Sequence, residues 1–154
     1  MTLQECLSIT DEMKPNMMSR KLKIKYLTEI EQLIYNEIIL NHYPERPAPP
    51  AGGTGEPPWW PQPIPVGPEG HPVPPDPEPA PKYTEDTDPG TVLLVPDVYA
   101  NVYTYWLMTK IDMQNQEDAR YNIDRAYFEN AYDTFSDYYT RTHMPVQRTR
   151  EFRL

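Results

Sequence analysis

Eighteen of the twenty prolines fall between residues 44 and 96, together with all six glycines. Proline lacks the backbone N–H that helices and central strands use, so neither element is expected to run through this segment. Polyproline II and turns are expected instead, with a brief extended stretch at the apolar run 92–95. The chain is therefore predicted to divide into a first helical part (residues 1–43), a proline-rich acidic insertion (44–96), a second helical part (97–142) and a basic tail (143–154).

The first helical part contains clear start and stop signals. Thr2 and Glu5 have the spacing of a capping box, and Pro15 is expected to end the helix that they begin. Ser19 is a candidate cap for a second helix that is expected to reach about Asn41. Its apolar positions recur at Leu27, Ile30, Ile34 and Ile38, widened by Tyr26, Leu33 and Ile39. Four charged residues are expected to lie largely off this stripe: Lys23, Glu29, Glu31 and Glu37.

The second helical part is rich in aromatic residues. Pro96 and Asp97 favour the start of a third helix. A turn is expected near residues 114–116, which would make a helical hairpin, and one long bent helix is the alternative because no glycine or proline marks the turn. A fourth helix from about Glu117 to Thr142 is expected to end before Pro145. The apolar face of the third helix comprises Val98, Tyr99, Val102, Tyr103, Trp106, Leu107 and Ile111. That of the fourth comprises Ala119, Ile123, Tyr127, Ala131 and Tyr138, with Phe128, Tyr132 and Phe135. We predict an all-α fold, a small bundle of about four helices that the insertion interrupts and that ends in an extended arm.

Charge is unevenly distributed along the chain. The formal net charge is −9, which argues against a protein that simply coats nucleic acid, because phosphate contacts need Lys and Arg. Nine acidic residues lie between positions 44 and 98, against only Arg46 and Lys82. The C-terminal end of the chain is basic through Arg141, Arg148, Arg150 and Arg153. Such segregation favours a protein that meets different neighbours with different faces.

Few residues have the spacing of a catalytic or metal-binding motif. His42, His71 and His143 form no metal-ligand spacing with Cys6, which is interpreted as a small core residue. There is no phosphate-binding glycine loop and no Gly-x-Ser-x-Gly turn. The carboxylates of residues 112, 117 and 118 are interpreted as capping and solvated groups. We therefore expect no enzyme, no cofactor and no metal. The lone cysteine, the absence of a signal pattern and the short apolar runs predict a protein that is neither secreted nor membrane-spanning.

Two features have alternative interpretations. The aromatic stripe is either helix–helix core or a surface between subunits, where Tyr and Trp are favoured, and both uses are expected. The insertion is either a ligand for SH3-type domains or an ordered strap across neighbouring subunits, pinned by Trp59 and Trp60. Acidic flanks and scarce local Arg or Lys disfavour the SH3-type interpretation.

The two helical parts resemble the small head–tail connector (adaptor) proteins of tailed phages and Firmicutes prophages. The resemblance covers about residues 1–43 and 91–145. In the first helical part it rests on Asp11, Glu12, Lys14, Pro15, Asn16, Ser19, Lys23, Leu27, Ile30, Ile34 and Tyr35. In the second it rests on Leu94 to Asp97, Tyr99, Tyr103, Tyr105 to Leu107, Ile111, Asp112, Asn115, Glu117, Arg120 to Asn122, Phe128, Ala131, Tyr132, Tyr138, Tyr139 and Arg141 to Pro145. The long insertion departs from the pattern, so its role is not assigned by the resemblance.

The resemblance implies a structural protein of the virion that is assembled in the host cytoplasm. Such a subunit forms a ring, commonly of twelve copies, beneath the portal protein at the head–tail junction, or neck. The ring extends the DNA channel without reading its sequence and carries a head-closure (stopper) or tail protein. A contact of the insertion with the capsid is a further expectation. The candidate subunit or portal interface comprises Tyr99, Tyr103, Trp106, Tyr138, Arg141, His143, Pro145, Arg148, Arg150, Phe152 and Leu154, and the candidate insertion anchors are Trp59 and Trp60.

Two other functions are compatible with the same residues. One is a related neck or tail-completion protein, which would share the helices but dock elsewhere. The other is a cytoplasmic scaffold that presents polyproline ligands, which would be a monomer that binds an SH3-type domain.

Overall fold

The computed structural model describes residues 1–42, 79–143 and 145. These residues form four α-helices, two 3₁₀ turns and no strand, which confirms the all-α class for this part of the chain. The elements in order are α1 (Leu3–Met13), α2 (Arg20–Glu37), η1 (Ile39–Asn41), η2 (Asp97–Tyr99), α3 (Asn101–Asn115) and α4 (Asp118–Thr142).

The helix starts predicted near the N-terminus are confirmed. The Thr2 hydroxyl accepts a hydrogen bond from the Glu5 N–H (3.2 Å), and the Glu5 carboxylate accepts one from the Thr2 N–H (2.8 Å). Ser19 caps α2 by accepting from the Leu22 N–H at 3.3 Å. The α-helix ends at Glu37, four residues before the predicted end, because the backbone tightens into the 3₁₀ turn η1.

Helices α3 and α4 are separate, which decides between the hairpin and the single bent helix that the sequence left open. Pro96 precedes the 3₁₀ turn η2, and the α-helix itself begins at Asn101. The reversal occurs at Gln116, which has a left-handed backbone (φ 58°) that side chains other than glycine rarely adopt. Its N–H bonds the carbonyl oxygens of Asp112 and Met113, which closes the end of α3. The predicted turn at 114–116 is therefore confirmed without the usual glycine signal.

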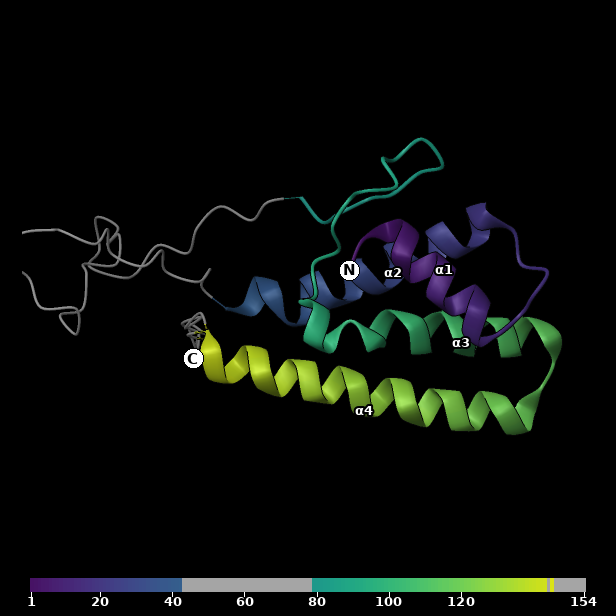
Figure 1. The fold of residues 1–154 in the computed structure, drawn as a ribbon. Helices are drawn as coiled ribbons and strands as arrows, with labels where there is room; N and C mark the ends of the chain where they lie inside the picture. The colour runs from purple at the N-terminus through teal and green to yellow at the C-terminus, as the bar shows by residue number, and fades with distance from the viewer. Residues whose placement is uncertain (43–78, 144, 146–154) are drawn as a thin grey trace, which may run out of the picture.

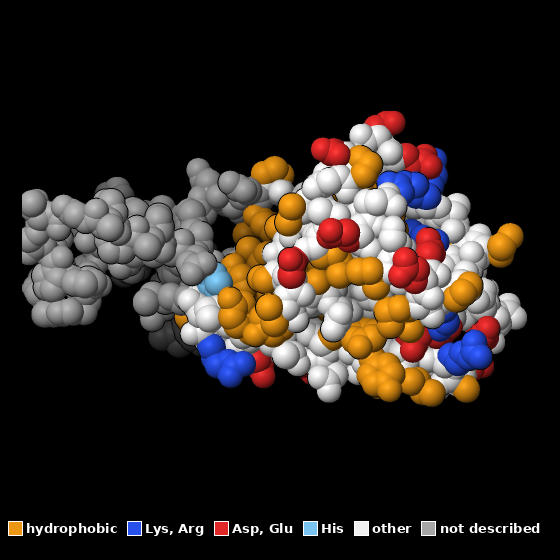
Figure 2. Space-filling view, viewed as in Figure 1, with side chains coloured by type: hydrophobic (Ala, Val, Ile, Leu, Met, Phe, Trp, Pro, Cys, Tyr) orange, Lys and Arg blue, Asp and Glu red, His pale blue; other side chains and the backbone are white. Residues whose placement is uncertain are grey.

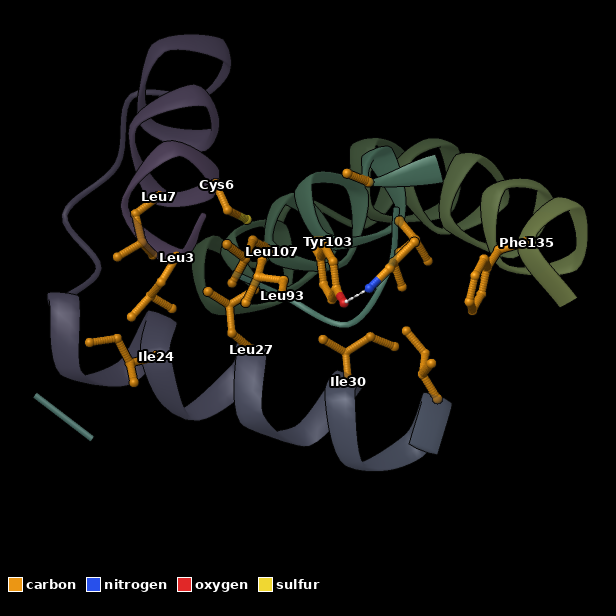
Figure 3. Close-up of a cluster of buried hydrophobic side chains, with 14 of the residues drawn as sticks. Leu3, Cys6, Leu7, Ile24, Leu27, Ile30, Leu93, Tyr103, Leu107 and Phe135 are labelled. Carbon is orange, nitrogen blue, oxygen red and sulfur yellow. Dashed lines mark hydrogen bonds between the residues drawn. The ribbon is translucent and has the colours of Figure 1, made fainter. Parts of the chain in front are cut away.

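The helices are arranged around α3, as Figure 1 shows. α3 and α4 run antiparallel as a hairpin, and α1 and α2 pack on α3. Leucines and isoleucines from α1, α2 and α3 meet in one core (Figure 3), and each fully buried aliphatic side chain contributes roughly 2 kcal/mol. Cys6 lies in this core with no exposed area, and burial raises the pKa of its thiol to about 12. The core assignment of Cys6 is confirmed.

Residues 79–95 form an irregular strap on the α1–α2 side. Thr2 and Val92 make an antiparallel bridge, and the Leu3 N–H donates to the Thr91 carbonyl at 2.9 Å. Leu93 and Val95 are buried, whereas the alternate residues 92 and 94 are exposed. The predicted extended stretch at 92–95 is confirmed only at its start, because residues 94 and 95 form a bend.

Glu31 of α2 holds the strap from inside. Its carboxylate has no exposed area and accepts hydrogen bonds from the hydroxyls of Tyr83 and Tyr103 (both 2.5 Å) and from the Leu94 N–H (2.8 Å). Burial raises the pKa of Glu31, because desolvation of the charged form outweighs the three hydrogen bonds that favour it. The same burial and the neighbouring carboxylate raise the pKa of both tyrosines.

The expectation that Glu31 and Lys23 lie off the buried stripe of α2 is wrong. Lys23 is only 5% exposed, and its ammonium lies 2.5 Å from the Asp11 carboxylate in α1. Both residues are buried because elements distant in sequence, α1 and the strap, cover the side of α2 that a lone amphipathic helix would leave in solvent.

Candidate subunit interface

The hairpin seam between α3 and α4 is narrow and aromatic. Among the 25 residues of α4, only Asp124 and Phe135 are buried. Phe135 lies against Tyr99 (ring centroids 6.1 Å apart), and Phe128 lies against Trp106 (4.9 Å). Most of the α4 surface therefore faces solvent in the single subunit.

Three residues that were expected in the buried stripe of α4 are not there. Ala119 is exposed, and Ile123 and Tyr127 are each 55% exposed, so their assignment to the stripe is corrected. The seam instead follows residues 124, 128, 131, 135 and 138, at alternating spacings of four and three. The apolar pattern of the sequence did not reveal this seam, because the polar residue Asp124 occupies one of its positions.

Trp106 and Tyr103 serve the interior of the subunit. The Trp106 ring N–H donates to the Tyr26 carbonyl at 2.9 Å, and the Lys110 ammonium lies 4.1 Å from the ring centroid. Trp106 thus joins α3 to α2. Tyr103 has no exposed area, and its hydroxyl accepts from the Val95 N–H at 3.0 Å (Figure 3). Neither ring is a free surface for a second chain.

The other described candidates gather at one end of the hairpin. Tyr99 stacks on Tyr138 with centroids 4.6 Å apart and planes 28° from parallel. His143 stacks on Tyr139 at 3.8 Å, and Arg141 is exposed. Pro145 pairs with residue 42 in an isolated bridge. The structure therefore brings residues 99, 138, 141, 143 and 145 together at the C-terminal end of α4, and we call this group the hairpin-end cluster.

Hydrophobic side chains also gather on this side of the molecule. Figure 2 shows them mainly over the end of α2, while Lys or Arg side chains lie over the end of α4. The remaining candidates, Arg148, Arg150, Phe152, Leu154, Trp59 and Trp60, lie outside the described residues.

A buried charge cluster fixes the opposite end of the hairpin. The Lys14 ammonium, at the end of α1, contacts the Asp112 carboxylate of α3 and lies 2.8 Å from the Asp124 carboxylate of α4. Asp112 has no exposed side-chain area, so its interpretation as a solvated or capping carboxylate is wrong. Three elements are tied together by one cation and two anions.

The pKa shifts in this cluster follow from burial and charge. Burial raises the pKa of Asp112, and the nearby Asp124 carboxylate adds to the rise, while Lys14 opposes it. Burial alone would lower the pKa of Lys14, but the hydrogen bonds and charges of the two carboxylates raise it overall. No spacing rule finds this cluster, because its members lie on three helical segments up to 110 residues apart.

The described residues offer neither a metal cluster nor a membrane-spanning helix. Within residues 1–42, 79–143 and 145, no group of three or more His, Cys, Asp or Glu side chains could hold a metal ion. No helix in the same ranges is both long and apolar enough to cross a membrane. Comparison of the chain with protein-family models, with curated proteins and with solved structures finds no match.

Proposed function

We propose that this chain is the subunit of a head–tail adaptor ring in the neck of a tailed-phage virion. The observation that carries the proposal is the exposure of α4, a 25-residue helix that buries only two of its residues in the subunit. A long helix with so little buried area is typical of a protein whose remaining surface is covered in an assembly. The residue pattern of the two helical parts, which resembles phage adaptor proteins, supports the same conclusion.

The geometry of a ring suits the faces that the subunit exposes. A heterologous contact that repeats around an axis joins two different patches of one chain and closes into a ring. The hairpin-end cluster is one such patch, through Tyr99 and Tyr138. The exposed start of α4, which carries Ile123, is the second. We propose that these subunits form a closed ring of twelve copies, the number that is common among the adaptor proteins that the chain resembles.

The proposed role is mechanical and involves no catalysis. The ring sits beneath the portal protein, extends the DNA channel and carries a head-closure or tail protein. The net charge of −9 supports a channel through which DNA slides without being held, because like charges repel. The DNA is not read, since base contacts have no role in such a channel.

The insertion and the arm complete the proposed subunit. The arm, residues 146–154, is basic through Arg148, Arg150 and Arg153, and it is proposed to dock on an acidic surface of the portal protein. Phe152 and Leu154 would anchor it in apolar pockets. The insertion is proposed to be held against the assembly rather than presented to an SH3-type domain.

Deleting residues 146–154 is expected to abolish binding to the portal protein while leaving the fold intact. The deletion leaves α1 to α4 and their core untouched, so helicity and the thermal midpoint should not change. Binding is measured by mixing the purified portal ring with the full chain or the truncated chain and weighing the complexes by native mass spectrometry.

A second variant separates charge from apolar anchoring. It keeps Phe152 and Leu154 but replaces Arg148, Arg150 and Arg153 by glutamine, and it is expected to bind more weakly at low salt only. Unchanged docking of the truncated chain would refute the role of the arm. Failure of the full chain to bind any portal ring would refute the adaptor proposal itself.

A further inference from the structure

A groove runs along the hairpin seam on a side that α2 does not cover. It has a volume of about 310 Å³ and lies between η2 with the start of α3 and the middle of α4. Its lining includes Val98, Asn101, Tyr105, Tyr127, Asn130 and Thr134. The side chains of the hairpin that hydrogen-bond α2, those of Tyr103, Trp106 and Tyr132, are not among the residues that line the groove.

The chemistry of the groove suits a polyproline segment. The rings of Tyr105 and Tyr127 are 5.6 Å apart, and Tyr127 and Val98 are 55% and 81% exposed. Within the described residues of the chain, no hydrogen bond joins either tyrosine hydroxyl or the Asn101 amide. Polyproline II has no internal hydrogen bonds, so its carbonyls need donors and its rings need flat apolar faces. Grooves that are lined by aromatic rings, with hydroxyl or amide groups free to donate hydrogen bonds, are the usual sites for proline-rich ligands.

The chain itself contains such a segment. Nine prolines lie between residues 57 and 75, beside Trp59 and Trp60. The described C-terminal flank of the insertion already packs in this manner on α2. There the Gln32 amide donates to the Pro81 carbonyl (3.4 Å), and the Thr28 hydroxyl donates to the Tyr83 carbonyl (3.4 Å) and accepts from its N–H (3.1 Å). Side-chain donors on a helix thus bind backbone carbonyls of the proline-rich chain.

The length of the segment and its starting point allow it to reach the groove. The chain that leads into the segment leaves His42, whose ring packs against Tyr139 of α4 with ring centroids 5.4 Å apart. Thr134, at the near end of the groove, lies five residues before Tyr139, which is about 7.5 Å along the helix axis. Residues 43–78 would span roughly 110 Å as polyproline II, several times the dimensions of the hairpin end.

We propose that the α3–α4 groove is a polyproline-binding surface and that residues 57–75 of the same molecule occupy it. The tether favours the same molecule over a neighbouring copy, because a short linker gives an effective concentration on the order of millimolar. The proposal does not depend on ring formation, and it assigns the insertion to a surface of its own subunit.

Tryptophan fluorescence of the full chain tests this proposal. The signal of Trp59 and Trp60 is obtained by subtracting the spectrum of the double variant W59F/W60F, which retains Trp106. Acrylamide quenching of this signal is expected to be weaker in the full chain than in a free peptide of residues 57–75. Tyr127→Ala should remove the protection and restore the quenching of the free peptide.

Ile123→Ala is the matched control. Ile123 is on the same helix, is equally exposed and is not among the groove-lining residues, so its replacement should leave the protection unchanged. Circular dichroism establishes that both variants fold. The protection should also be the same across concentrations at which light scattering shows a monomer.

Three results would overturn the proposal. The first is quenching in the full chain equal to that of the peptide, and the second is protection that survives Tyr127→Ala. The third is protection that appears only when the chain associates, which would assign the occupant to a neighbouring copy.

Discussion

Replacing Glu31 by alanine is expected to lower the free energy of unfolding by about 3 kcal/mol or more, since three donors around a buried carboxylate lose their acceptor. The hydroxyls of Tyr83 and Tyr103 and the Leu94 N–H all bond this carboxylate, and the side chain has no exposed area. The strap should loosen from α2 as well. Urea unfolding measures the loss, and faster hydrogen exchange at Leu94 and Val95 reports the strap.

Glu31→Gln is the matched control, and it also tests the pKa shift. Because the folded state raises the pKa of Glu31 above its ordinary value of 4.5, the folded chain binds more protons than the unfolded chain. The contribution of this group to stability is therefore fully present below pH 4.5 and is lost as pH rises through the folded pKa. Glutamine cannot titrate, so the stability advantage of the natural chain over Glu31→Gln should shrink as pH rises. An advantage that grows with pH would contradict a raised pKa.

Replacing Lys14 by methionine is expected to cost about 3–5 kcal/mol, because it leaves two neighbouring carboxylates buried without a cation. Asp112 is fully buried, and the side chains of Lys14 and Asp124 are only 13% and 10% exposed. The loss should be smaller at low pH, where the Asp112 carboxylate, whose pKa is raised, becomes protonated. Urea unfolding at several pH values measures both effects.

Two further variants test whether the buried charge cluster causes the stability loss of Lys14→Met. Adding Asp112→Asn to Lys14→Met should recover some of the loss, with a coupling energy on the order of 1 kcal/mol or more. Lys21→Met removes a lysine whose side chain is 77% exposed and lies 3.7 Å from Glu85. That change should cost less than about 0.5 kcal/mol. Equal losses for Lys14→Met and Lys21→Met would refute the role of the cluster.

Local signals predicted the helices well, because helix ends depend on nearby residues. The capping box at Thr2 and Glu5, the cap at Ser19 and the stop at Pro15 all act within a few positions along the chain. The turn at Gln116 was also placed correctly, although no glycine marks it. The end of α2 was misplaced by four residues, because nothing in the sequence distinguishes the last helical turn from a 3₁₀ turn.

Burial of charged residues was not predictable in the same way. Glu31 and Asp112 look like solvent-facing positions until their partners are known, and those partners lie 52 or more residues away. The polar seam residue Asp124 likewise displaced the expected stripe of α4 toward Ile123 and Tyr127. In each case tertiary contacts override a local pattern, because a buried carboxylate needs donors that only the fold can supply.

The fold divides the aromatic residues of the candidate interface into two groups. Sequence reasoning grouped Tyr99, Tyr103, Trp106 and Tyr138 by residue type, whereas the fold separates them. Tyr99 and Tyr138 stack at the hairpin end, while Trp106 and Tyr103 are committed to contacts within the subunit. Aromatic composition alone could not make this division, because tyrosine and tryptophan are favoured both in cores and at interfaces.

Symmetry-resolved imaging of the neck in virions that carry this chain tests the central claim most directly. The adaptor proposal predicts a closed ring of the chain immediately beneath the portal, with α4 surfaces buried between neighbouring subunits and an open channel along the axis. A neck that lacks this chain, or a chain present only as single copies outside the portal axis, would contradict it.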